Sequence, residues 1–185
     1  MTVLIVYAST EGQTRKICRF CAAELSGAGM SVELLSAADA AGTDVGRYRA
    51  AILAGSVHIG KIQPALIDFA RQNGAALAGI PTLYLQVSLA AAGRDPDEMA
   101  ELQRIAKAAF ADTGWTPGRT EHVAGAFRFT EYDFFRTLAM RWIASQRDDA
   151  VDPHKDKEYT DWDALSAVLA EWRETVQAAS AAGPR

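Results

Sequence analysis

Short apolar runs alternate along this chain with stretches of helical periodicity, and this alternation constrains the fold more than any other feature. The apolar runs are nearly continuous, as expected for strands covered on both faces. The stretches between them carry apolar side chains at helical spacing. Such alternation predicts a parallel sheet with helices on both faces. The predicted strands are residues 3–8, 32–35, 49–55, 80–88 and 122–127, and the predicted helices are 13–25, 64–73, 96–110 and a last helix capped by Thr160.

The composition predicts one globular domain. The chain has 185 residues, of which 49% are hydrophobic and 23% charged, enough to bury a substantial core. We expect one domain over residues 1–178 and a tail over 179–185. The net charge of −4 argues against a nucleic-acid binder. Two cysteines and no signal-peptide pattern predict a cytoplasmic location. The uncharged stretch 72–93 contains Gly74, Gly79 and Pro81, so a turn and a buried strand are expected there instead of a membrane span.

Three loops follow the carboxyl ends of predicted strands, where ligands bind in sheets of this kind. They span residues 9–14, 55–61 and 88–94. The first loop has three hydroxyls, one glycine and a helix start, a combination that can hold a phosphate on backbone N–H groups. The alternative is simple helix capping by Thr10 or Thr14. The position after the first strand favours the phosphate.

The first loop resembles the FMN phosphate loop of flavodoxins. Four further stretches resemble one branch of that superfamily, the menaquinone-dependent protoporphyrinogen dehydrogenases of bacterial haem synthesis. The matching segments are Ser9-Thr10-Glu11-Gly12-Gln13-Thr14, Gly55-Ser56-Val57-His58-Ile59-Gly60, Ala124-Gly125-Ala126-Phe127-Arg128-Phe129, Tyr132-Asp133-Phe134-Phe135 and Lys157-Glu158-Tyr159-Thr160-Asp161-Trp162.

This resemblance implies a flavodoxin-like, doubly wound, five-stranded parallel sheet of order 2-1-3-4-5. It also implies that FMN is the cofactor. The implied reaction is oxidation of protoporphyrinogen IX to protoporphyrin IX, with menaquinone as the quinone acceptor. The implied phosphate contacts are Ser9, Thr10, Glu11, Gly12, Gln13 and Thr14, and the implied ring contacts are Ser56, Val57, His58, Ile59, Gly60, Ser88, Leu89, Ala90 and Ala91.

The second loop nearly matches the Walker A pattern G-x-x-x-x-G-K-[ST], which offers a nucleotide-binding alternative. Ile62 stands where the hydroxyl should be, and Pro64 delays the helix, so this alternative is disfavoured. In the flavin interpretation, His58 and Lys61 would add positive charge near the ring and favour two-electron chemistry. The alternative for His58 is an ordinary loop histidine.

The third loop contains no aromatic residue to cover a flavin ring. Shuttle flavodoxins usually enclose the ring between aromatics, so an uncovered face favours an enzyme over the alternative, a flavodoxin-type electron carrier without its own substrate. An aromatic side chain from elsewhere in the chain could also cover the ring.

A long insertion, residues 128–159, separates the last strand from the last helix. Six aromatic residues lie between Phe127 and Trp142, and residues 128–147 carry four arginines against two acids, a net charge of +2. Such a segment could contact the cytoplasmic face of the inner membrane, give access to a quinone, or cover an acidic tetrapyrrole through groups such as Arg128. The alternative is an ordinary helix packed on the core. His58 and Arg128 are the substrate-site candidates, and no catalytic base is assigned.

Cys18 and Cys21 form a C-x-x-C pattern inside the first predicted helix. Redox pairs of this kind lie at helix N-termini, so these thiols are predicted to be buried apolar groups. A zinc site would need two further ligands at motif spacing, and we expect no metal.

Overall fold

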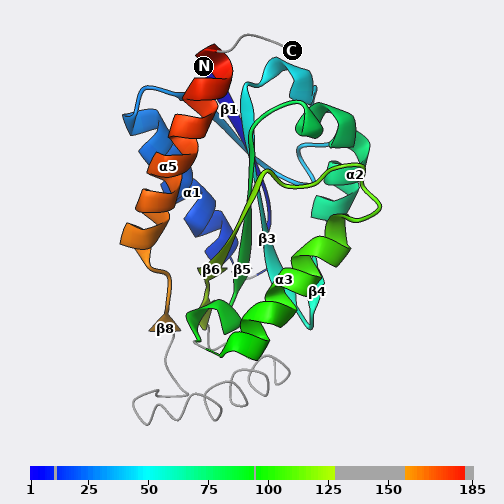
Figure 1. Ribbon diagram of the computed structural model, residues 1–185, viewed down its shortest axis with the longest axis vertical. Helices are drawn as coiled ribbons and strands as arrows, with labels where there is room; N and C mark the ends of the chain where they lie inside the picture. Colours follow the sequence, from blue (N-terminus) through cyan, green and yellow to red (C-terminus); the bar gives the residue numbers. More distant parts are fainter. Residues whose placement is uncertain (11, 94, 128–156, 182–185) are drawn as a thin grey trace.

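The computed structural model describes residues 1–10, 12–93, 95–127 and 157–181. Five parallel strands form its sheet, in the order β2-β1-β3-β5-β6 (Figure 1). This confirms the predicted order, since these are the first to fifth long strands of the chain. Their bounds are β1 Thr2–Ala8, β2 Ser31–Ser36, β3 Ala50–His58, β5 Thr82–Ser88 and β6 Arg119–Ala124.

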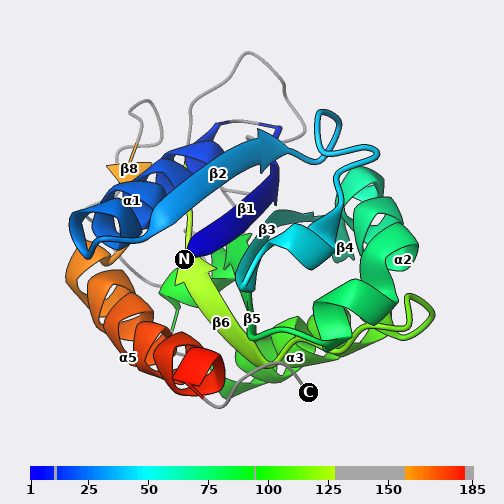
Figure 2. The same ribbon diagram turned by 90° about the horizontal axis from the view of Figure 1, so that it is seen from above.

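Helices cover both faces of the sheet (Figure 2). On one face lie α1 (Gln13–Gly27) and α5 (Trp162–Ala181), and on the other lie α2 (Pro64–Ala78) and α3 (Pro96–Phe110). Two short 3₁₀ helices, η1 (Val45–Arg47) and η2 (Ala90–Ala92), lie in connections. Pro64 and Pro96 occupy first helical turns as predicted, because their missing N–H groups cost nothing there.

The alternation of side chains along each strand divides the core into two layers. On β1, Leu4 and Val6 pack toward α2 and α3, whereas Val3 and Ile5 pack toward α1 and α5. All four side chains have no solvent exposure. The strand runs are therefore continuous in apolar residues because both faces of the sheet are covered.

The two cysteines belong to the layer under α1. Cys18 and Cys21 are free thiols with no solvent exposure. Burial raises the pKa of Cys18 well above its ordinary value and that of Cys21 to about 12. The prediction that both cysteines are buried is confirmed.

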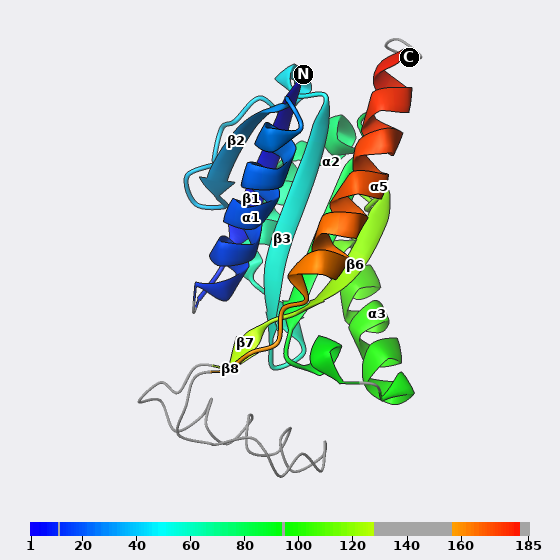
Figure 3. The same ribbon diagram turned by 90° about the vertical axis from the view of Figure 1, so that its left-hand side faces the viewer.

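Two short ribbons were not predicted. Strand β4 (Lys61–Ile62) turns back antiparallel on the end of β3, so α2 begins only at Pro64. Strands β7 (Ala126–Phe127) and β8 (Lys157–Glu158) pair antiparallel beyond the sheet (Figure 3). The predicted strand 122–127 was wrong at its end, because Gly125 donates its N–H to Ser88 but accepts from Tyr159, which diverts the chain toward β8.

The cap of the last helix was also predicted wrongly. Asp161, not Thr160, accepts the backbone N–H of Ala164 at the start of α5. The Thr160 hydroxyl is instead buried and donates to the carbonyl oxygen of Ala124. A tertiary contact therefore takes the side chain that the local pattern assigned to capping.

None of the helices in the described ranges is both long and apolar enough to cross a membrane.

Candidate functional site

The carboxyl ends of the parallel strands meet at one edge of the sheet, and the loops that follow them form the candidate site. Strands β1, β3, β5 and β6 end there at Ala8, His58, Ser88 and Ala124. The β7–β8 ribbon lies at the same end, away from the N-terminus (Figures 1 and 3). The first predicted loop is joined to the start of α2, because the carboxamide of Gln63, the N-cap residue of that helix, donates to the Thr10 hydroxyl at 2.6 Å.

The first loop leads into α1 without a side-chain cap. The hydroxyl of Ser9 accepts the N–H of Gly12 at 3.0 Å, and Gly12 has a left-handed φ of 87°. No side chain accepts an amide of the first turn of α1 among the described residues. Capping by Thr10 or Thr14 is therefore wrong, and these amides remain available for an anion.

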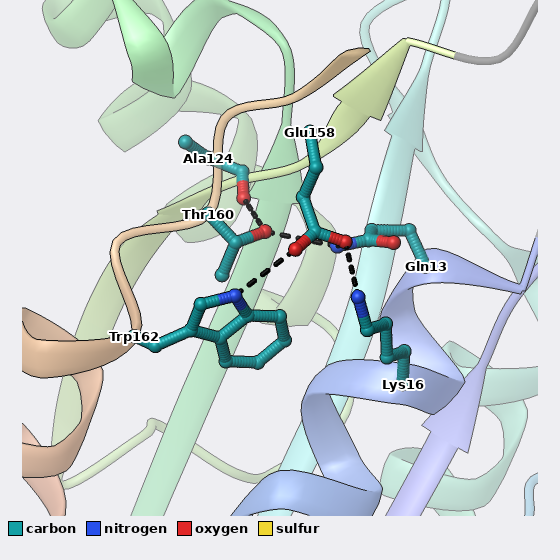
Figure 4. A network of polar contacts seen from close by, with 6 residues as sticks. All are labelled: Gln13, Lys16, Ala124, Glu158, Thr160 and Trp162. Carbon is teal, nitrogen blue, oxygen red and sulfur yellow. Dashed lines mark hydrogen bonds and ion pairs between the residues drawn. The ribbon is translucent and has the colours of Figure 1, made fainter. Parts of the chain in front are cut away.

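The side chain of Gln13 lies in a polar network with Glu158 and Thr160 (Figure 4). Its Nε2 donates to Glu158 Oε2 and to Thr160 Oγ1, both at 3.0 Å. Its Oε1 is buried and has no hydrogen-bond partner in the described part of the chain. Only the backbone of Gln13 is thus suited to an anion. Thr14 is also buried, with 1% of its surface exposed.

The carboxylate of Glu158 is the centre of this network (Figure 4). It accepts from Lys16 Nζ at 2.6 Å and from Trp162 Nε1 at 3.0 Å, in addition to Gln13. These donors, Lys16 above all, hold the pKa of Glu158 below its usual range. The network fastens β8 to the first turns of α1. Sequence reasoning missed it, because the partners are up to 147 residues apart.

The second loop is a tight hairpin. Val57 and His58 pair with Ile62 and Lys61, which leaves Ile59 and Gly60 as the two turn residues, with φ of 49° and 68°. Ile59 is strained, because a β-branched residue disfavours positive φ, and 69% of its surface is exposed. Since Lys61 lies in a strand and not at a helix start, the Walker A alternative is wrong.

His58 has a defined partner in this hairpin. Its Nε2 lies 3.0 Å from the hydroxyl of Ser56, two residues earlier on β3. Both side chains are half-buried. The hairpin therefore presents one polar pair and one exposed apolar side chain at the edge that carries the first loop.

The third loop is short and has no aromatic residue. Ser88 is buried, and its hydroxyl accepts the N–H of Ala91 at 3.2 Å. Leu89 precedes η2, in which Ala90 and Ala91 are half-buried. At Ser88 and in η2 the loop thus supplies small side chains on a folded backbone.

Glu11, Arg94 and residues 128–156 lie outside the described residues, and with them Arg128 and the segment 128–147. In the described ranges, no group of three or more His, Cys, Asp and Glu side chains is arranged to hold a metal ion.

Residues 4–154 match a family described as "Flavodoxin domain". This chain belongs to the flavodoxin domain family. The predicted cofactor, FMN, is thereby confirmed, and the chemistry of this flavodoxin domain is flavin redox chemistry. The first loop suits the phosphate of FMN, because no side chain caps the first amides of α1. The Ser9 and Thr10 oxygens each accept an N–H, so the proton of each hydroxyl can be donated to the phosphate.

Relatives of this flavodoxin domain match most of its length. It is 24% identical over 167 residues to "Protoporphyrinogen IX dehydrogenase [quinone]" of Escherichia coli (strain K12), covering 90% of this chain and 91% of the relative. A protein of the same name from Leishmania major is 24% identical, covering 88% and 70%. A solved structure, "Structure of a flavodoxin from the domain Archaea", aligns with a TM-score of 0.51 at 14% identity, covering 96% and 99%, and supports the fold alone.

Proposed function

We propose that this flavodoxin domain is an FMN-dependent protoporphyrinogen IX dehydrogenase that passes electrons to a quinone, with menaquinone as the physiological acceptor. The observation that carries the proposal is the match to proteins of that name over 90% of this chain. The loop after β5 supports it, because without an aromatic residue it leaves room for a substrate at the ring.

The first loop would hold the phosphate of FMN. Ser9 and Thr10 would donate their hydroxyl protons, and the backbone N–H groups of Gln13 and Thr14 would donate from the start of α1, beside Gly12, whose own N–H is held by Ser9. Glu11 is part of the same loop. The hairpin residues Ser56, Val57, His58, Ile59 and Gly60 and the residues Ser88, Leu89, Ala90 and Ala91 would flank the ring.

FMN held in these loops would supply the redox chemistry, by which each protoporphyrinogen IX loses six electrons and six protons and three quinones are reduced to quinols. The protein would orient both partners and exclude water. His58, held by Ser56, is a candidate for contact with the substrate. Arg128 would pair with a carboxylate of the tetrapyrrole, since a guanidinium matches that group in geometry and charge.

The surplus of arginine over acid in residues 128–147 supports a peripheral membrane contact through that segment. Co-sedimentation with anionic vesicles tests this part independently. Binding that persists in neutral vesicles or in high salt would contradict an electrostatic contact.

An anaerobic assay tests the proposed activity. We expect purified, yellow protein to convert protoporphyrinogen IX to fluorescent protoporphyrin IX only when a menaquinone analogue is present. His58→Ala should slow this conversion without releasing FMN. A yellow protein that is inactive but accepts electrons from a flavodoxin reductase would establish the electron carrier instead.

A further inference from the structure

We infer that Gln63 is a positioning residue that aims the hydroxyl proton of Thr10 at the phosphate of FMN. The inference rests on the phosphate site of the proposed function. It adds a residue from a different loop, for which the sequence motif gives no signal.

The backbone explains why the Gln63 side chain is free to do this. Gln63 precedes Pro64, and a residue before proline is held in extended conformation, here with φ of −60° and ψ of 131°. It stands at the N-cap position of α2, yet its side chain does not cap that helix. Buried Ile62, paired with Val57, anchors the backbone just before it. The carboxamide can therefore extend across to the first loop.

The contact itself fixes the direction of a proton. Gln63 Nε2 donates to Thr10 Oγ1 at 2.6 Å. A threonine hydroxyl has one proton and two acceptor positions, so an oxygen that accepts from an amide sends its own proton elsewhere. Thr10 is exposed at the loop that leads into the uncapped start of α1. An anion seated there would receive the proton.

Ser9 shows the same arrangement within the loop. Its oxygen accepts the N–H of Gly12, so its proton is also available outward. The two hydroxyls differ in what holds them: a backbone amide of the same loop for Ser9, and a side chain at the start of α2 for Thr10. Of these two donors, only the Gln63 side chain can be removed by substitution without changing the first loop.

Calorimetric titration of the apoprotein with FMN and with riboflavin tests the inference, because riboflavin has the ring but not the phosphate. We expect Gln63→Ala to weaken FMN binding about three- to tenfold and to leave riboflavin binding within twofold. Gln63→Glu should weaken FMN binding further, since a carboxylate would take the Thr10 proton and repel the phosphate. Gln72→Ala and Gln72→Glu, at an exposed glutamine of the same helix, are the matched controls and should change neither affinity.

A double-mutant cycle completes the test. On a Thr10→Val background, Gln63→Ala should have no further effect on FMN binding, because its only route to the phosphate is gone. Additive losses, an equal loss for riboflavin, or tighter FMN binding by Gln63→Ala would each overturn the inference. If the unaltered protein binds FMN and riboflavin equally, the phosphate site itself is refuted. If it prefers FMN and Gln63→Ala keeps that preference, only the role of Gln63 is refuted.

Discussion

Gln13 Nε2 lies 3.0 Å from Glu158 Oε2, although 145 residues separate the two side chains in the sequence. One residue opens the first helix, and the other belongs to a strand at the far end of the insertion. The contact fixes the start of α1, which follows the first loop, relative to the β7–β8 ribbon. A substitution in either segment should therefore shift the position of the other.

Glu158→Gln should lower the free energy of unfolding at neutral pH and make it depend less on pH in the acid range. The folded protein holds the pKa of Glu158 below that of the unfolded chain, so ionised Glu158 stabilises the fold above the unfolded value of about 4.3. This contribution is lost as the pH falls through the folded pKa. We expect a loss of about 1 kcal/mol at pH about 7, shrinking below pH about 4.

Urea unfolding at several pH values measures this difference. Glu174→Gln, at an exposed glutamate of α5, is the control and should follow the unaltered protein throughout. The Glu158→Gln variant and the unaltered protein should differ in free energy of unfolding by less at acid pH than at neutral pH. A difference that stays constant over this range would show that ionisation of Glu158 is not involved.

Gly12→Ala should destabilise the protein by roughly 1 kcal/mol, because φ of 87° suits glycine and strains alanine. No atom lies within 4 Å of where the new Cβ would stand, so the cost is conformational. Gly27→Ala, at the end of α1 with equal space and an ordinary φ, should be neutral or stabilising. Chemical denaturation of both variants decides the matter, and equal effects would argue against the left-handed loop.

Ile59→Asn should stabilise the apoprotein by about 0.5–1 kcal/mol, since asparagine tolerates positive φ and little buried surface is lost. The same change should weaken riboflavin binding if the hairpin flanks the ring. Ile59→Val keeps the β-branch and should change stability little. Thermal unfolding without FMN and titration with riboflavin measure the two effects. An Ile59→Asn variant less stable than the unaltered protein would contradict backbone strain at Ile59.

Cys18 and Cys21 should not react with Ellman's reagent in the folded protein at pH about 8, because the thiols are buried and burial raises the pKa of each thiol. Both should react at once in denaturant. Absorbance at the thionitrobenzoate band follows the reaction. Rapid modification of one thiol under native conditions would reveal a reactive cysteine on α1.

Local patterns predicted the helix starts at Pro64 and Pro96, because the fixed φ of proline suits a first helical turn. The strand order, in contrast, was predicted from the family resemblance and not from a local pattern. The β3–β4 hairpin escaped prediction because Ile59-Gly60 is an unusual pair for a turn with two positive φ values. Thr160 was assigned to the wrong role, since a threonine before a helix is a good cap until a distant partner takes its hydroxyl.

Strands β7 and β8 pair so that Phe127 stands opposite Lys157. The chain therefore leaves β7 and returns at β8 through adjacent positions, and the residues that form the five parallel strands all lie outside 128–156. A change in the length or sequence of the segment between β7 and β8 therefore need not alter the strands that carry the cofactor loops. Substrate preference among relatives can diverge by changes in this segment.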